Sequence, residues 1–278
     1  MELSKRLQTV AGAVTPGNRM ADIGTDHGYV PIYLLKNKIC PSALAMDVNP
    51  GPLERAREHI HREGLEGPIK TRLSNGLEKL SPGETDSIVI AGMGGDLMCR
   101  ILKAAPEILQ KGVELILQPQ SEWFKVRHFL ADHGYGIEKE WFLEEEGKYY
   151  VIIRAVKNMD SRKEERRINQ TGQDKEKITV SSSVDLIKEL YFEYGYYLIH
   201  SKNPVLFEYL QKEAKKKEKI AREMETQVFL ESSSLDKMSR EFPSQNLQMK
   251  QKKRLERCEI LKKEVKGIRK LLAEMEEK

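Results

Sequence analysis

Residues 19–28 read Arg-Met-Ala-Asp-Ile-Gly-Thr-Asp-His-Gly, and this stretch decides the fold. Its first part, 20–23, is apolar apart from the carboxylate Asp22, and Gly24 then permits a tight turn and a close approach of the backbone. The segment that follows, 29–35, is again apolar and has the pattern of a helix. A strand, a glycine turn and a helix in this order predict the first unit of an open α/β sheet, whose ligands bind at the carboxyl ends of the strands.

Further apolar runs predict the rest of this sheet. Four of them have the length of buried parallel strands, at 43–47, 69–73, 86–91 and 113–117. Two runs of alternating polarity, 136–143 and 148–156, predict an antiparallel pair joined by a turn. We therefore predict an α/β fold with a Rossmann-like sheet of seven strands, mostly parallel and closed by an antiparallel hairpin. This arrangement resembles that of S-adenosylmethionine-dependent methyltransferases, since dinucleotide dehydrogenases keep their sheet parallel.

The charges around the glycine turn indicate which cofactor it would hold. A dinucleotide fingerprint needs three glycines, so that a pyrophosphate can rest on a helix N-terminus. Here only Gly24 and Gly28 are present, and Asp22, Asp26 and His27 crowd the turn. Two carboxylates would repel a pyrophosphate, but they suit a cofactor with an ammonium and a sulfonium group, such as S-adenosyl-L-methionine. The alternative is that Asp and Gly serve here only as turn residues.

The ends of the next strands carry further candidate ligands. Asp47 follows Gly24 at the distance at which a βαβ unit brings a carboxylate beside ribose hydroxyls, although such an acid can also cap the next helix. Asn75 ends the third strand, where it would contact an adenine ring, cap a helix, or do both. Three glycines within 92–95 allow the backbone to approach a ligand closely, or to make a tight turn and nothing more.

Composition limits the class of protein. The 278 residues carry a net charge of +4 and three cysteines, with no Cys-x-x-Cys pair that would indicate zinc, so we expect no metal and a reducing cytoplasm. Neither a signal peptide nor a membrane-spanning run is recognisable. Residues 1–157 hold 20 Lys and Arg against 21 Asp and Glu, and the remainder holds 27 against 22. A basic second half fits an acidic partner, and solvated helices give the same balance.

The C-terminal third has a different pattern. We predict a methyltransferase domain at 1–157, a polar linker or insertion at 158–185, and a helical coiled-coil domain at 186–278. In the last of these, two long charged runs carry apolar stripes and predict an antiparallel helical hairpin. The stripes are Leu206, Leu210, Ala214, Ala221, Met224 and Val228, and then Leu261, Val265, Ile268, Leu272 and Met275. Lysine runs at 215–217 and 252–254 are typical of solvated helices, so contact with nucleic acid is a hypothesis.

Several short motifs resemble those of a known family, the bacterial tRNA (adenine-N1)-methyltransferases that modify adenine 22. They are Leu3-Ser4-Lys5-Arg6-Leu7, the segment Ala21 to Tyr29, Asp47, Ser74-Asn75-Gly76, Ala91-Gly92-Met93-Gly94-Gly95 and Gln118-Pro119-Gln120. The resemblance covers residues 1–157 and 190–278. The polar stretch at 158–183 is longer than this family needs, and its role is open.

The resemblance implies roles for individual residues. The pocket for S-adenosyl-L-methionine would use Asp22, Gly24, Thr25, Asp47, Asn75, Gly76, Gly92 and Met93. The catalytic residues would be Asp26, His27 and Tyr29, with His27 alternatively a satisfied turn histidine. Lys5 and Arg6 would bind tRNA phosphates or lie on a solvated surface. The partner would be tRNA, contacted also by the coiled-coil tail of a monomeric protein.

The chemistry of adenine N1 agrees with these residues. N1 carries an in-plane lone pair, so transfer requires positioning, worth about 7–11 kcal/mol, and no strong base. Enzymes that act on N6 usually carry Asn/Asp-Pro-Pro-Tyr/Phe after the fourth strand, where this chain has Gly-Met-Gly-Gly. Asp26 is the candidate for stabilising the charge on the ring or accepting from the N6 amine. The alternatives are a methyltransferase for a small molecule or a protein, and a non-catalytic cofactor-binding scaffold.

Overall fold

The computed structural model describes residues 2–157, 182–238 and 245–277. They form two compact units, one built on the sheet and one on the C-terminal helices, and the short segment Phe192–Leu198 groups with the sheet. The predicted linker lies outside the described residues as far as 181. The predicted domain limits 1–157 and 186–278 therefore stay predictions.

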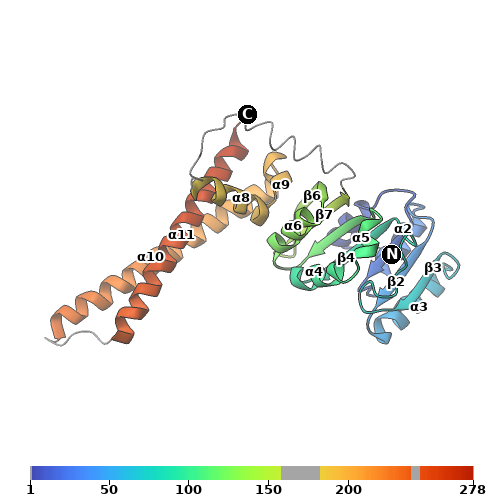
Figure 1. Ribbon diagram of the computed structural model, residues 1–278, viewed down its shortest axis with the longest axis horizontal. Helices are drawn as coiled ribbons and strands as arrows, with labels where there is room; N and C mark the ends of the chain where they lie inside the picture. The colour runs from blue at the N-terminus through green and yellow to red at the C-terminus, as the bar shows by residue number, and fades with distance from the viewer. Residues whose placement is uncertain (1, 158–181, 239–244, 278) are drawn as a thin grey trace. The chain divides into compact units, whose positions relative to one another are not determined.

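The first unit contains a single sheet of seven strands in the order β3-β2-β1-β4-β5-β7-β6 (Figure 1). The first five strands are parallel, while β7 pairs antiparallel with both β5 and β6. This order confirms the predicted fold, including the closing hairpin. The strands are β1 (Met20–Ile23), β2 (Ala43–Asp47), β3 (Ile69–Leu73), β4 (Ser87–Met93), β5 (Glu114–Pro119), β6 (Tyr135–Glu145) and β7 (Lys148–Lys157).

Helices cover the sheet and bury its apolar side chains. One core cluster joins Val10, Ile32 and Ile60 of three helices to Val89 and Ile116 of the sheet, and all are at most 2% exposed. The three helices are α1 (Lys5–Gly12), α2 (Tyr29–Lys36) and α3 (Pro50–Arg62). Elsewhere α4 packs against β4 and α6, with bounds α4 (Gly95–Lys103), α5 (Pro106–Gln110) and α6 (Trp123–Asp132). The packing of these buried side chains fixes the positions of the strand ends, which carry the candidate site.

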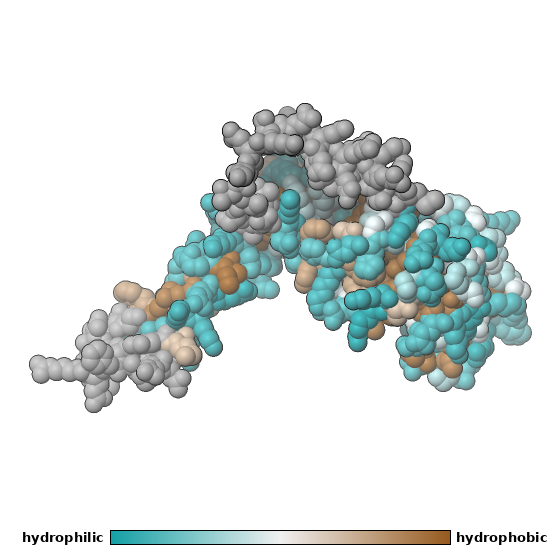
Figure 2. Space-filling model, in the orientation of Figure 1, coloured by the Kyte–Doolittle hydropathy of each residue, from teal (hydrophilic) through white to brown (hydrophobic). Residues whose placement is uncertain are grey.

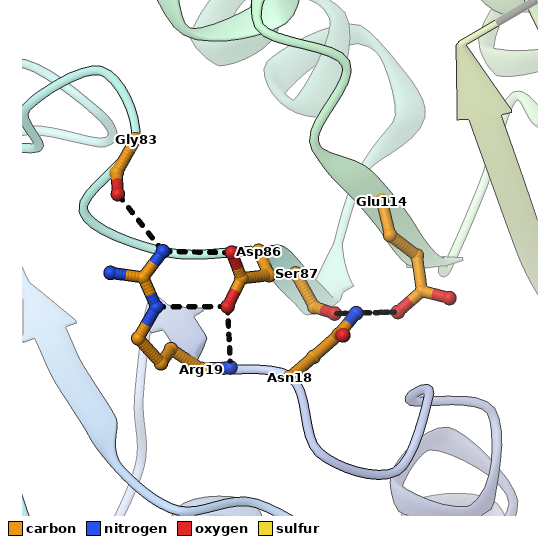
Figure 3. A network of polar contacts seen from close by, with 6 residues as sticks. All are labelled: Asn18, Arg19, Gly83, Asp86, Ser87 and Glu114. Atoms are coloured by element: carbon orange, nitrogen blue, oxygen red, sulfur yellow. Dashed lines mark hydrogen bonds and ion pairs between the residues drawn. The ribbon is translucent and has the colours of Figure 1, made fainter.

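A polar network ties together the amino ends of three strands (Figure 3). The Arg19 guanidinium donates two hydrogen bonds to the carboxylate of Asp86, at 2.8 and 2.9 Å, and one to the carbonyl oxygen of Gly83, while the Arg19 backbone amide donates a third to Asp86 at 2.9 Å. The buried carboxylate of Glu114 accepts from the Ser87 hydroxyl at 2.5 Å and, more distantly, from the Asn18 amide at 3.5 Å. Hydrogen bonds to charged groups are the stronger kind, so this network holds the amino edge of the sheet in register.

A buried ion pair fastens the segment Phe192–Leu198 to the sheet unit. Arg127 of α6 and Glu140 of β6 are 2% and 4% exposed, and their side chains meet at 2.7 Å. Arg127 also donates to the carbonyl oxygens of Phe192 and Glu193, at 2.8 and 2.9 Å. A Cβ atom on Gly195 would lie 2.6 Å from the Glu140 carboxylate, so only glycine fits there.

The second unit contains the predicted antiparallel hairpin. Helices α10 and α11 lie side by side (Figure 1) and are joined by a series of ion pairs, among them Lys217–Glu264 at 2.6 Å and Arg254–Glu231 at 2.5 Å. The partners run in opposite directions along the chain, as an antiparallel pair requires. The helices that follow the sheet in the chain are α8 (Ser182–Tyr194), α9 (Tyr196–His200), α10 (Pro204–Met238) and α11 (Gln245–Glu276), and the end of α8 and the start of α9 fall within Phe192–Leu198.

The interior of this hairpin follows most of the predicted stripes, although Met224 and Val228 are only half-buried. Leu261, Ile268 and Met275 are buried as expected, but Leu271 is buried where the pattern indicated Leu272, which is half-buried. A straight helix has 3.6 residues per turn, so a strict seven-residue count drifts around its surface. Hydrophilic residues cover much of the hairpin surface seen in Figure 2. None of the described helices combines the length and apolarity needed to cross a membrane.

Candidate active site

The parallel strands bring the predicted site segments to one edge of the sheet. Asp22 lies in register with Ala45 of β2 and Val89 of β4, and the ends of these strands therefore lie next to each other. The chain reverses its strand order between β1 and β4, which makes this edge the switch point where ligands bind in open α/β sheets. Sequence and topology thus agree on the location of the site.

Glycine allows the first and fourth strand ends to touch. Gly24 adopts a φ of +77°, and a Cβ atom at this position would lie 2.2 Å from the Met93 Cε atom. The amides of Gly24 and Thr25 both donate to the Met46 carbonyl oxygen, at 2.8 and 2.9 Å. The turn is therefore tightly held, with Gly24 in close contact with the end of the Met93 side chain, and we call this turn the glycine cradle.

A buried carboxylate lies beside this cradle. Asp22 is 6% exposed, and burial raises its pKa from 3.8 to about 6. The Thr25 side chain lowers this pKa in part, while the negative charges of Asp47 and Asp26 raise it further. Among the described residues no cation forms an ion pair with Asp22. A carboxylate that is costly to ionise alone gains from a cationic ligand, so the residues present fit the ammonium group of S-adenosyl-L-methionine.

The second and third strand ends continue the same edge. Asp47 is half-buried, and one of its carboxylate oxygens accepts from the Asn49 amide at 2.7 Å, so it shapes the turn before α3. Asn75 donates to the Glu78 carboxylate at 2.6 Å. Gly76 has a φ of +55° and packs closely against Ile101 of α4. Ribose and adenine binding by these residues stay predictions.

Three aromatic rings stack beside the cradle. The rings of His27 and Tyr29 are 5.0 Å apart and inclined by 7°, and the His59 ring lies 5.2 Å from the first and 5.5 Å from the second. His59 Nδ1 lies 3.0 Å from the His27 carbonyl oxygen, which can only accept, so Nδ1 carries the proton. His59 was not predicted, although its position between Ala56 and Ile60, both buried, indicates the inner side of α3.

Asp26 lies at the exposed side of this ring stack. Its side chain is 68% exposed and lies 3.2 Å from the Arg55 guanidinium and 3.5 Å from His27 Nε2. Arg55 was not predicted either, and it holds the carboxylate near the rings. Within the part of the chain that the structure describes, no cluster of His, Cys, Asp and Glu could hold a metal ion.

The two predicted tRNA contacts, Lys5 and Arg6, have different surroundings. Lys5 is exposed, with its amine 3.5 Å from the Glu144 carbonyl oxygen. Arg6 is half-buried and donates to the Gln118 carboxamide at 2.7 Å, with its guanidinium 5.5 Å above the Tyr150 ring. The structure therefore directs Arg6 toward the end of β5 and not into open solvent. Its role and that of Lys5 in binding tRNA stay predictions.

The strand order and the acid-rich turn define the class, a methyltransferase. A family model described as a methyltransferase domain matches residues 3–153. Over 155 residues the chain is 41% identical to the tRNA (adenine(22)-N(1))-methyltransferase of Bacillus subtilis, an alignment that covers 56% of this chain and 65% of that protein.

Two solved structures extend the similarity to nearly the whole chain. The crystal structure of the B. subtilis m1A22 tRNA methyltransferase TrmK is 31% identical with a TM-score of 0.68, covering 95% of this chain and 98% of that one. Streptococcus pneumoniae Sp1610, in complex with S-adenosyl-L-methionine, is 29% identical with a TM-score of 0.70, covering 98% and 100%. The chain belongs to the family of tRNA (adenine22-N1)-methyltransferases.

Proposed function

We propose that this protein transfers a methyl group from S-adenosyl-L-methionine to N1 of adenine 22 in tRNA. The observation that carries the proposal is the buried Asp22 carboxylate at the switch point, beside a glycine cradle and without a cation of its own among the described residues. Membership of the family supplies the substrate and the methylated atom.

The cofactor is held by the strand ends. When bound, S-adenosyl-L-methionine supplies a methyl group on a positively charged sulfur. Asp22 faces its ammonium group, with the backbone of Gly24 and Thr25 and the Gly92–Met93 segment closing around the chain of the amino acid. Asp47 accepts from the ribose hydroxyls, and Asn75 and Gly76 border the adenine of the cofactor.

The stacked rings orient the acceptor. His27, Tyr29 and His59 present a flat aromatic surface on which an extruded adenine stacks. No residue has to remove a proton from N1, because its lone pair lies in the plane of the ring. Asp26 lies near the edge of this surface, where its carboxylate stabilises the positive charge that develops on the adenine or accepts from the N6 amine.

Binding of tRNA must make N1 of the adenine accessible. N1 lies on the pairing edge of adenine, so the base must be unpaired or extruded, at a cost of a few kcal/mol. Lys5 and the exposed lysines on one side of α11, Lys252, Lys263, Lys266 and Lys270, bind phosphates in a salt-dependent way. On this proposal the protein acts as a cytoplasmic monomer.

Nucleoside analysis by mass spectrometry tests the proposal. Unmodified tRNA is incubated with the protein and labelled S-adenosyl-L-methionine, and labelled 1-methyladenosine is expected. A labelled small molecule or protein in place of tRNA would identify the alternative methyltransferase. Binding of the cofactor without transfer to any of these acceptors would identify a scaffold.

A further inference from the structure

A bulge interrupts the fourth strand where it reaches the site. The regular pairing of β4 with β5 shifts between Ala91 and Met93, and Gly92 within the bulge has a φ of +80°. The amide of Gly92 therefore loses its place in the ladder and donates instead to the side-chain oxygen of Gln118, at 3.0 Å. Gln118 is fully buried and Gly92 is half-buried, so this bond is partly shielded from water.

Arg6 is the second donor to that oxygen. Its guanidinium lies 2.7 Å from Gln118 Oε1, and Gln118 Nε2 in turn donates to the Pro119 carbonyl oxygen at 3.2 Å. Two donors on one side and one acceptor on the other fix the orientation of the carboxamide. Turned over, the amide would face both donors with its NH₂ group.

The position of Arg6 is itself fixed by the closing hairpin. The Glu145 carboxylate accepts from the backbone amides of Lys5 and Arg6, at 2.5 and 3.3 Å, and so caps the first turn of α1. The Tyr150 ring lies under the Arg6 guanidinium. A continuous chain of contacts thus leads from β6 and β7 through Arg6 and Gln118 to the bulge.

We propose that Arg6 is a positioning residue that acts through Gln118 to hold the Gly92–Met93 bulge, and that it is not a phosphate contact. This inference rests on the proposed function of the site. The bulge lies against Gly24, where the methyl donor and the adenine meet, and a displacement of about 1 Å there reduces a rate by about 10²-fold. Loss of Arg6 therefore lowers kcat.

The variant Arg6→Met tests this proposal, with Arg62→Met as a control that removes an exposed arginine at the far end of α3. We expect Arg6→Met to lower kcat by about 10²-fold while the tRNA KM and the salt dependence of binding stay those of the wild type. Arg62→Met should change neither parameter. A raised KM at unchanged kcat, with a salt slope reduced by about 1, would show that Arg6 is a phosphate contact.

Two further variants separate position from charge. Arg6→Lys keeps the charge but cannot lie over Tyr150 and reach Gln118 together, so kcat should fall here too; wild-type kcat would overturn the proposal. In a double-mutant cycle, Arg6→Met combined with Gln118→Leu should be no slower than Gln118→Leu alone. Effects that multiply would mean that Arg6 acts by another route.

A spectroscopic measurement keeps the inference independent of tRNA methylation. The ¹⁵N-labelled amide of Gly92 should shift and exchange faster in Arg6→Met, with no such change in Arg62→Met. An unchanged Gly92 signal overturns the relay even if the wild type methylates tRNA. A changed signal in a protein that does not methylate tRNA would instead overturn the proposed function.

Discussion

The two edges of the sheet treat a buried carboxylate in opposite ways. At the amino edge Glu114 is 5% exposed and accepts from the Thr15 and Ser87 hydroxyls, both at 2.5 Å, with the Arg154 guanidinium 2.9 Å away. At the carboxyl edge Asp22 is as deeply buried and has no ion-pair partner in the described chain. The negative charge at the amino edge is neutralised by groups of the protein itself, whereas the charge of Asp22 requires a cationic ligand. A buried charge without a partner in the protein distinguishes a binding site from a stabilising network.

The largest effect is expected from Asp22→Asn. Loss of the buried carboxylate removes the partner of the ammonium group, which should weaken cofactor binding by about 10²–10³-fold, as for one partner of a buried pair. The same change should stabilise the ligand-free protein by up to about 3 kcal/mol at neutral pH, because ionised Asp22 is costly when its pKa is about 6. Calorimetry with the cofactor and denaturant unfolding measure the two effects. If Asp22→Asn lowered both cofactor affinity and the free energy of unfolding, Asp22 would stabilise the fold as Glu114 does, and the two edges would not differ.

Glu114→Ala is expected to lower the stability of the protein and to leave cofactor binding unchanged. It leaves several buried donors without an acceptor and should lower the free energy of unfolding by about 3 kcal/mol. Cofactor affinity, measured at a temperature where the variant is folded, should stay within about twofold of the wild type, since the network lies at the other end of the strands. An affinity loss comparable to that of Asp22→Asn contradicts the assignment of this edge to stability alone.

The pH dependence of cofactor binding sharpens the comparison further. The folded-state pKa of Asp22 is raised, so the carboxylate is ionised above about pH 6 and protonated below it. Affinity should fall about tenfold from neutral pH to about pH 5, and Asp22→Asn should flatten this profile. The native state binds protons more tightly than the unfolded chain between about pH 4 and 6, so this group's contribution to stability decreases as pH rises. A profile that persists in Asp22→Asn would point to another titrating group.

The smallest effect is expected from His59→Leu at the ring stack. Replacing the His59 ring removes aromatic contacts with His27 and Tyr29, each worth about 0.5–1.5 kcal/mol. Methylation of tRNA should slow by a few-fold to about tenfold, with cofactor affinity unchanged. His61→Leu, at an exposed position of the same helix, is the matched control. Equal rates for His59→Leu and the wild type would show that the rings do not orient the base.

The sequence predicts the sheet well because its signals are local. Buried strands of four to seven residues, a glycine turn such as Gly24, and the alternation of 136–143 all report on the residues next to them. The right-handed rule limits how parallel strands connect, and the resemblance to methyltransferases supplies their arrangement in the sheet. The sequence alone therefore locates the candidate edge.

Partners from distant parts of the chain could not be predicted in this way. Arg55, His59 and Gln118 reach the site only through the packing of α3 and β5, and no local pattern assigns a side chain to a neighbour on another element. The bulge at Gly92 has the same cause, because it depends on pairing between strands. The shift from Leu272 to Leu271 reflects helix geometry over several turns.

The contact of Arg127 with the carboxyl end of α8 has a consequence for limited proteolysis. Because Arg127 donates hydrogen bonds to Phe192 and Glu193, a break in the backbone between 158 and 181 leaves a second, non-covalent attachment in place. The nicked protein should therefore elute as one species in native gel filtration and separate into two fragments only in denaturant. Arg127→Leu should release the C-terminal fragment without denaturant.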